Sequence, residues 1–398
     1  MNFSALKTAD GLDLTGIRVI VRADLNVPVR DGVVTDSTRI TRAAPGLLDL
    51  ASRGARVIVL SHFGRPKGER NLEFTLKPVA DKLSEVLQRN IAFASDCIGE
   101  PAQTTSAALQ PGDIALFENL RFHKGEETND PHFAAELAKF ADIYVDEAFS
   151  TSHRAHASNS GITKYLPSYA GPLMMEEINA LRAALDDPLR PTAAVVGGAK
   201  VSTKIPVLEN MLDKVDVLII GGGMANTFLQ AKGLNVGKSL AESDYNDIAR
   251  AIMDKALANN CRIILPSDAV IANEFKQGAQ TYTVEVTNVP TDTMILDVGS
   301  KSVAELAQVL GTCRTLLWNG PLGAFEIEPF GKGTFAVARI AAALTDVGAL
   351  KTIAGGGDTV AALNSAGVAD RFSYVSTAGG AFLEWLEGRD LPGVVALA

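Results

Sequence analysis

Arginine and histidine gather in four short segments in the first half of the chain. The segments span residues 22–28, 61–66, 118–123 and 146–156, and each follows a short apolar run typical of a strand. Ligands of open α/β sheets bind at the carboxyl ends of strands. Arginine suits carboxylate and phosphate because its guanidinium is planar and always charged. Each arginine alone could be a solvated surface residue, but together they predict a pocket for a small ligand carrying both groups.

Glycine takes the corresponding places in the second half. The glycine segments span residues 197–200, 221–223, 319–323 and 355–359, and each leads towards a helical pattern. Glycine lets the backbone approach a phosphate closely, and the start of a helix supplies free N–H groups with a favourable dipole. We therefore expect a nucleotide phosphate site in this half.

Charged side chains accompany these glycines. Lys200 and Lys204 are spaced by four, so they would lie on one face of a helix beginning after residue 198 and could both reach phosphate oxygens. Asp358 could hold Mg²⁺ through hard oxygen ligands, although an acidic residue at a helix start is also a common cap. Glu326 could accept hydrogen bonds from a ribose, or it could be a surface carboxylate.

Two segments resemble other nucleotide-binding motifs and fail their requirements. Residues 233–239 have three residues between the glycines, where a Walker A loop requires four, and they follow a helical pattern instead of a strand. Residues 221–226 lack the third glycine of a dinucleotide fingerprint, and no strand-end acid follows at the usual distance. The first motif is rejected, and a nicotinamide enzyme is only weakly supported.

The elements that must position these residues alternate between short β-branched runs and amphipathic patterns. Strands are expected at residues 18–21, 57–60, 114–117, 143–145, 193–196, 217–220, 263–265, 294–297, 315–318 and 352–354. Such alternation predicts parallel sheets covered by helices on both faces. The strand count exceeds one small sheet, and the best break is residues 161–191, which contain a helical pattern. We predict an α/β fold with two doubly wound, Rossmann-like domains joined by a hinge helix.

Composition narrows the classes of protein. The chain has 398 residues, 47% of them hydrophobic, without an apolar run of about 18 residues that could cross a bilayer. The first ten residues lack a secretory pattern, so we expect a cytoplasmic protein. The cysteines Cys97, Cys261 and Cys313 have no CxxC spacing, which argues against a disulfide framework or a zinc site. The net charge of −9 disfavours binding to nucleic acid or to anionic membranes.

Seven segments, in the family's order, resemble phosphoglycerate kinase. They are residues 22–28, 61–66, 118–122, 153–158, 197–205, 318–321 and 355–359. The resemblance implies an N-terminal domain, residues 1–170, for 3-phosphoglycerate or 1,3-bisphosphoglycerate. It also implies a C-terminal domain, residues 171–385, for Mg²⁺-bound ADP or ATP, and a tail, residues 386–398, that packs back on the first domain.

The same resemblance implies roles for individual residues. The positions that would contact the acid substrate are Asp24, Asn26, Arg39, His62, Arg65, Arg121 and Arg154. Those near the transferring phosphoryl group are Arg39, Lys200 and Lys204, and Asp358 would serve the metal. The positions that would contact the nucleotide are Lys204, Gly221, Gly222, Asn319, Pro321, Glu326, Gly355, Gly356, Gly357, Asp358 and Thr359.

The implied activity is reversible phosphoryl transfer from 1,3-bisphosphoglycerate to ADP in glycolysis and gluconeogenesis, by a monomer. Because each half carries only part of the machinery, we expect hinge closure around residues 161–177. A noncatalytic nucleotide-binding protein would not need the arginine and histidine cluster. Three positions depart from the family's pattern: Ala378 replaces a glycine, and Phe63 and Ser150 replace other residues.

Overall fold

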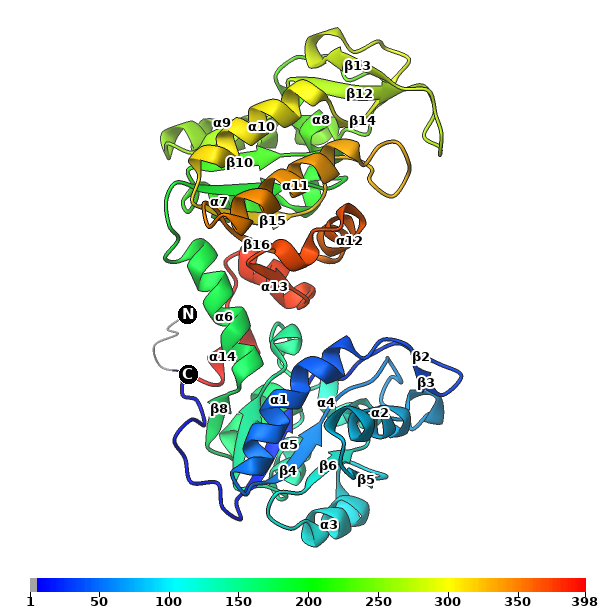
Figure 1. Cartoon of the computed structure of the whole chain (residues 1–398), viewed down its shortest axis with the longest axis vertical. Coiled ribbons are helices and arrows are strands. Elements are labelled where there is room, and N and C mark those ends of the chain that lie inside the picture. Colours follow the sequence, from blue (N-terminus) through cyan, green and yellow to red (C-terminus); the bar gives the residue numbers. More distant parts are fainter. Residues whose placement is uncertain (1–5) are drawn as a thin grey trace. The chain divides into compact units, whose positions relative to one another are not determined.

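Six strands of the first half pair into one sheet in the computed structural model, which describes residues 6–398 (Figure 1). In spatial order they are β5 (Ala92–Ala94), β6 (Ile114–Phe117), β4 (Arg56–Leu60), β1 (Arg18–Arg22), β7 (Ile143–Asp146) and β8 (Ser168–Ala170). All neighbouring pairs are parallel. The chain leaves β1 towards β4 and later returns to its other side at β7, so β1 lies at the topological switch where ligands bind.

Helices cover this sheet because their apolar faces match its buried strands. They include α1 (Thr38–Ser52), α2 (Lys77–Leu87), α3 (Gly99–Ala108) and α5 (Pro131–Ala138). Ile40 and Leu47 of α1 and Leu83 of α2 pack with Val19 and Val57 in one core. The core holds β1 rigidly, and the residues that follow β1 are thereby fixed.

A second parallel sheet forms in the other half. Its spatial order is β11 (Arg262–Ile264), β10 (Val217–Ile220), β9 (Thr192–Val196), β15 (Thr315–Asn319), β16 (Lys351–Gly355) and β17 (Tyr374–Ser376). Its helices are α7 (Ile205–Leu212), α8 (Gly222–Ala231), α9 (Asn246–Ala258), α10 (Ser300–Thr312), α11 (Lys332–Asp346), α12 (Gly357–Ala366) and α13 (Gly380–Leu386). Trp318 is almost fully buried in its core. The predicted class, two parallel α/β sheets, is confirmed.

One predicted strand pairs differently from the expectation. β14 (Met294–Val298) lies in a three-stranded antiparallel sheet with β12 (Asp268–Ala272) and β13 (Tyr282–Glu285). The prediction that residues 294–297 continue the parallel alternation is therefore wrong. Parallel strands need a long crossover, usually a helix, whereas the connections from β12 to β13 and from β13 to β14 contain no α-helix and allow antiparallel pairing.

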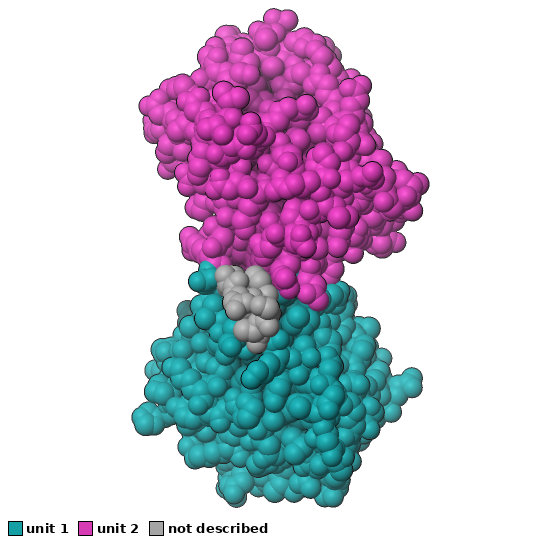
Figure 2. All heavy atoms as spheres, turned by 90° about the vertical axis from the view of Figure 1, so that its left-hand side faces the viewer, with its two compact units in different colours: residues 1–178, 390–398 teal, residues 179–389 magenta. Residues whose placement is uncertain are grey.

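The chain divides into two compact units, coloured separately in Figure 2. Unit 1 comprises Met1–Ile178 and Asp390–Ala398, and unit 2 comprises Asn179–Arg389. The boundary falls inside α6 (Pro172–Leu185), the helix expected to act as a hinge. At the other end, α14 (Pro392–Val395) packs on unit 1, where the Gly393 N–H donates to the carbonyl of Ser152 at 2.9 Å.

The cysteines and the helices of the described residues can be compared with the expectations from the sequence. The three cysteines are buried free thiols. Among residues 6–398, no helix combines the length and apolarity that crossing a bilayer requires.

A buried carboxylate caps the start of α6. Glu147 follows β7, and its Oε2 accepts a hydrogen bond from the backbone N–H of Leu173 at 2.7 Å. Gly46 and Gly171 make room for it, because a Cβ at either would lie within 2.7 Å of a Glu147 carboxylate oxygen. Burial raises the pKa of Glu147 from 4.5 to about 7, although the N–H groups of Leu173 and Met174 oppose the shift.

This raised pKa predicts a pH-dependent cost of folding. Because the folded pKa lies above the unfolded one, the contribution of Glu147 is most favourable below pH 4.5 and is lost as pH rises through about 7. Glu147→Gln keeps an acceptor without the charge. Its unfolding free energy relative to the parent protein should therefore rise by about 1–3 kcal/mol between pH 5 and pH 8.

Scanning calorimetry at both pH values checks this expectation. The exposed carboxylate Glu69 offers a matched control, because Glu69→Gln should show the same difference from the parent at pH 5 and pH 8. If the difference in unfolding free energy between Glu147→Gln and the parent is the same at pH 5 and pH 8, the raised pKa of Glu147 is contradicted.

Candidate active site

The residues that follow β1 meet the start of α1. The Oδ2 atom of Asp24 accepts from the guanidinium of Arg39 at 2.7 Å, and it also accepts from the hydroxyl of Ser150. The backbone carbonyl of Asn26 accepts from the same Arg39 nitrogen at 3.1 Å. Burial alone would raise the pKa of Asp24, but the guanidinium groups of Arg39 and Arg22 and the Ser150 hydroxyl favour its ionised form and lower that pKa. Ser150 thus belongs to this cluster.

The loop after β4 is tied to the same cluster. The side-chain oxygen of Asn26 accepts from the N–H of Gly64 at 3.0 Å. Phe63 is held by Asn119, whose amide group exchanges hydrogen bonds with both backbone groups of Phe63 at 3.0 and 2.7 Å. The phenyl group lies in the core of unit 1. This departure from the family's pattern therefore leaves the loop firmly anchored.

His62 is a neutral imidazole in a cationic environment. Its Nδ1 lies 3.2 Å from a terminal nitrogen of Arg22. A guanidinium has N–H donors and no acceptor, so Arg22 must be the donor in this contact. Burial and the charge of Arg22 lower the pKa of His62 well below 6.5. The Nδ1 atom therefore accepts, which leaves the proton on Nε2 as a donor.

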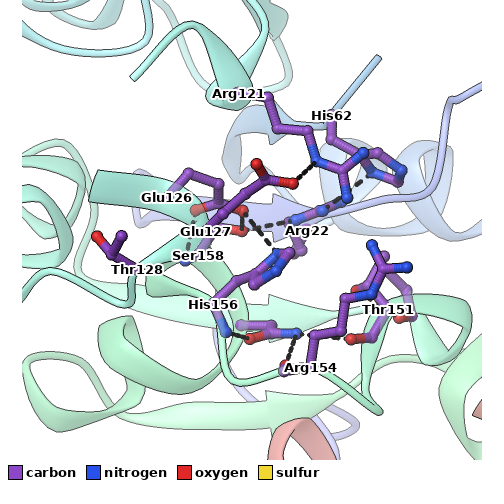
Figure 3. Close-up of polar contacts among 12 residues, drawn as sticks. Arg22, His62, Arg121, Glu126, Glu127, Thr128, Thr151, Arg154, His156 and Ser158 are labelled. Atoms are coloured by element: carbon purple, nitrogen blue, oxygen red, sulfur yellow. Dashed lines mark hydrogen bonds and ion pairs between the residues drawn. The ribbon is translucent and has the colours of Figure 1, made fainter. Parts of the chain in front are cut away.

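Three of the predicted arginines lie in different settings. Arg121 is buried, donates to the carbonyl of Gly64 at 2.8 Å, and pairs with Glu127 at 3.2 Å. Burial lowers its pKa, and Arg154 lowers it further by repulsion. Arg65 and Arg154 are exposed. Figure 3 shows Arg22 between His62 and Arg121 on one side and His156 and Arg154 on the other. The residues Arg22, His62, Arg121 and Arg154, which lie at or after several strand ends, thus form one cluster, called the cationic cluster below.

The strand ends of unit 2 meet through glycines. Gly320 has a φ of +93°, and a Cβ there would lie 2.1 Å from the carbonyl oxygen of Gly197. Gly222 has a φ of +69°, and its Cβ would lie 2.6 Å from the carbonyl oxygen of Gly198. Side chains at these positions are therefore excluded by both conformation and space. The backbone segments that follow β9 and β15 and the start of α8 therefore approach each other closely, and space remains at this edge of the sheet.

Two adjacent cavities occupy that room. The first, of about 290 Å³, is lined by Gly197, Gly198, Ala199, Lys200, Thr203, Lys204, Asn319, Gly320, Gly356, Gly357, Asp358, Thr359 and Leu383. The second, of about 360 Å³, shares Gly198, Ala199 and Asp358 with the first. Its other predicted residues are Gly222, Pro321 and Glu326. Gly221 and Gly355 line neither cavity, because they face Leu322 and Phe382.

Lys204 lies inside the smaller cavity. Its Nζ donates to the side-chain oxygen of Asn319 at 2.7 Å, and the amide nitrogen of Asn319 donates to the carbonyl of Gly355 at 2.8 Å. Burial lowers the pKa of Lys204, and Glu387 and Asp358 partly offset that effect. The start of α12 faces the same space, with Gly356 at a φ of +96°. The cavity therefore combines a cation with free helix N–H groups.

The prediction that Lys200 and Lys204 share one helix face is wrong. A single 3₁₀ turn, Val201–Thr203, separates them, and α7 begins only at Ile205. Pro206 lies in the first turn of α7 and has no N–H, so an α-helix cannot extend back through Lys200 with its hydrogen bonds intact. Both lysines still line the smaller cavity.

Some site residues escaped the sequence reasoning. The larger cavity has an apolar lining that includes Leu240, Phe275, Met294 and Leu296, and part of it comes from β14. A run of apolar residues gives no signal that distinguishes a ligand wall from a core. In unit 1, Glu126 and His156 are buried beside Arg22, although only the histidine-rich segment around residue 156 hinted at such a place.

Ala378 fits its position despite replacing a glycine. Its N–H donates to the hydroxyl of Ser376 at 3.2 Å, and Ala378 is not among the residues with positive φ. Nothing in its backbone conformation requires glycine.

Comparison with known proteins gives a consistent result. The family described as phosphoglycerate kinase matches residues 9–389. The phosphoglycerate kinase of Rhizorhabdus wittichii is 59% identical, and that of Rhizobium leguminosarum is 58% identical; the matches cover 99% of this chain and 99% and 98% of those proteins. The structure of phosphoglycerate kinase from Coxiella burnetii aligns with a TM-score of 0.92 at 44% identity, covering 98% of both chains. The crystal structure of the Pyrococcus horikoshii enzyme aligns at 0.80 and 29% identity, again covering 98% of both chains.

The close backbone approach beneath the cavities can be tested through stability. Gly320→Ala should lower the unfolding free energy of unit 2 by about 2 kcal/mol or more, because it combines a positive φ with a backbone clash. Both tryptophans, Trp318 and Trp385, lie in unit 2, so urea unfolding followed by tryptophan fluorescence reports on that unit.

The control is Gly311→Ala. A Cβ at Gly311 has open space and an ordinary helical position in α10, so this change should be neutral or stabilise by up to about 1 kcal/mol. Equal midpoints for the two variants would show that Gly320 is not constrained.

Proposed function

This chain belongs to the phosphoglycerate kinase family, and on that basis we propose which of its residues perform each part of the reaction. The enzyme transfers a phosphoryl group reversibly from 1,3-bisphosphoglycerate to ADP, giving 3-phosphoglycerate and ATP in glycolysis. We assign the acid substrate to unit 1 and the nucleotide to unit 2.

The acid substrate binds to the cationic cluster of unit 1. The observation that supports this assignment is that Arg39 and Arg121, which come from separate segments of the sequence, are joined through Asn26 and Gly64. His62, two residues before Gly64, lies 3.2 Å from Arg22. Arg65 and Arg154 are exposed and free to reach an incoming anion. The buried members are already oriented before binding, which reduces the entropy lost on association.

The nucleotide binds to unit 2. Its phosphates occupy the smaller cavity, where Lys204, Asn319, Gly356, Gly357 and Thr359 gather around the start of α12. Its base and ribose occupy the larger, mainly apolar cavity, where Glu326 accepts from the ribose hydroxyls. Gly222 and Pro321 line the larger cavity, whereas Gly221 and Gly355 line neither cavity and permit close packing against Leu322 and Phe382.

Asp358 is the residue that would hold Mg²⁺. Its carboxylate is exposed and lines both cavities. Mg²⁺ commonly takes one or two protein carboxylates together with ligand phosphates, so this single carboxylate beside a phosphate pocket fits the ion. Bound there, Mg²⁺ would neutralise charge on the nucleotide phosphates.

The transfer itself needs position and positive charge. Lys204 and Lys200 from unit 2 and Arg39 from unit 1 supply charge to the phosphoryl oxygens, and no covalent intermediate with the protein is required. Lys204 is held in place by Asn319, so its charge needs little rearrangement. We propose a cytoplasmic monomer, for which light scattering should return the 42.0 kDa mass of one chain.

Removing the charge of Lys204 should impair transfer. Lys204→Ala should lower kcat by about 10²-fold or more, about 2.7 kcal/mol, because a cation held in a partly buried site is lost. The exposed Lys255 in α9 provides a control, since Lys255→Ala should keep the parent kcat. A coupled assay of ATP formation measures both, and an unchanged kcat for Lys204→Ala would refute the assigned role.

Removing Arg121 should affect only the acid substrate. Arg121→Ala should raise the KM for 3-phosphoglycerate by about tenfold or more and leave that for the nucleotide within about twofold, since the nucleotide residues lie in unit 2. Arg18→Ala, which removes a guanidinium at the opposite end of β1, is the control. Equal weakening of both substrates would mean that the two sites are not divided between the units.

A further inference from the structure

Arg22 is a cation with almost no access to water. It ends β1, and only 1% of its surface is exposed. Its guanidinium donates to the hydroxyl of Ser158 at 2.8 Å and to the carbonyl of Ala23 at 2.6 Å, and it lies 3.2 Å from Nδ1 of His62. Arg22 therefore orients one of the residues assigned to the acid substrate. A buried charge of this kind is tolerated only when another group compensates it.

The compensating group is reached through Ser158. Glu126 lies in the short helix α4 (Lys124–Glu127) and is fully buried. One of its oxygens accepts from the Ser158 hydroxyl at 2.6 Å, and the other accepts from the Ser158 N–H at 3.0 Å. The chain of contacts runs from Glu126 to Ser158 to Arg22 and then to His62. Figure 3 shows this chain beside Arg121 and Arg154.

Ser158 also anchors the segment that carries Arg154. Nδ1 of His156 lies 3.7 Å from Glu126, and burial lowers the pKa of His156 to about 3, so the imidazole is neutral. Asn159 then closes the loop, because its amide oxygen accepts from the N–H of His156 and its nitrogen donates to the carbonyl of Arg154. Glu126 is thus connected to residues on both sides of the cationic cluster.

We propose that Glu126 is a positioning residue for 3-phosphoglycerate, which holds Arg22 and the segment around Arg154 in their binding geometry through Ser158. This inference rests on the proposed substrate site in unit 1. Glu126 has no exposed surface and cannot touch the substrate itself. Its effect must pass through the side chains that it holds.

Charge balance explains why a carboxylate is needed there. Arg22 and Arg154 both repel Arg121, and this repulsion is strongest when no anionic substrate is bound. Burial raises the pKa of Glu126, but Arg22 and both hydrogen bonds from Ser158 oppose that rise and favour the ionised form. Asp24 and Asp146 also feel the charge of Arg22, yet neither is bonded to Ser158.

The test removes the charge of Glu126 while keeping the shape of its side chain. Glu126→Gln should raise the Kd for 3-phosphoglycerate by about tenfold, measured by calorimetry on the full chain, and should leave the Kd for ADP within about twofold. Ser158→Ala breaks the same chain at its centre and should have a similar effect. Because the two residues act in series, adding Ser158→Ala to Glu126→Gln should change the Kd by less than about twofold further.

A stability control separates positioning from general loss of structure. Asp268 is another buried carboxylate that accepts from Ser302, but it lies in unit 2, so Asp268→Asn should lower the melting temperature without changing the Kd for 3-phosphoglycerate. If Glu126→Gln or Ser158→Ala melts early but binds the acid with parental affinity, the carboxylate serves folding only and the proposal fails. If Glu126→Gln does not fold, the result for Ser158→Ala decides.

Arg121→Ala distinguishes this failure from that of the proposed site. If Arg121→Ala weakens the acid and Glu126→Gln does not, the substrate site stands and the positioning role falls. If Arg121→Ala binds the acid as well as the parent, the proposed site itself is wrong. The proposal survives only when both variants weaken the acid and spare ADP.

Discussion

Parallel hydrogen bonding of β1 with β4 and β7, and of β9 with β10 and β15, is the constraint on which the rest of the structure depends. Parallel strands end at the same edge of a sheet, so residues distant in sequence meet there. In unit 1 that edge gathers Arg22, His62 and Arg121. In unit 2 it gathers Gly197 and Gly320. The same backbone pattern thus underlies both proposed anion sites, and the side chains set the chemistry of each.

In the proposed assignment, the two units bind anions by different physical means. Unit 1 uses guanidinium and imidazole groups, which bring specificity but must be desolvated and held apart. Unit 2 uses backbone N–H groups at the start of α12, with Lys204 as the buried cation. Backbone donors carry no net charge, so unit 2 needs no network of buried carboxylates around its phosphate pocket. Its requirement is space, which glycine provides.

Sequence reasoning indicated correctly which residues lie together at the strand ends and the helix starts beside them, while their roles in binding and transfer stay predictions. Asp24, Asn26 and Arg39 meet in unit 1, and Lys204 and Asn319 meet in unit 2. It failed where the outcome depends on packing in three dimensions. The pairing direction of β14 depends on how β12 and β13 are connected, and the start of α7 depends on Pro206. Glu126 gave no signal because a single glutamate in a polar segment is ordinarily exposed.

The buried charges of unit 1 explain a compromise between stability and binding. Arg22 and Arg121 would gain hydration if the unit unfolded, so keeping them inside costs folding free energy. In the proposed site, a bound trianionic acid would offset their mutual repulsion, so that ligand binding would stabilise unit 1 beyond the contacts that it makes. Unit 2 bears a cost of a different kind, because its glycines lose more backbone entropy on folding than other residues. Each unit thus loses folding free energy for a different reason, unit 1 through buried charge and unit 2 through glycine entropy. In unit 1, a bound acid substrate would recover part of that loss.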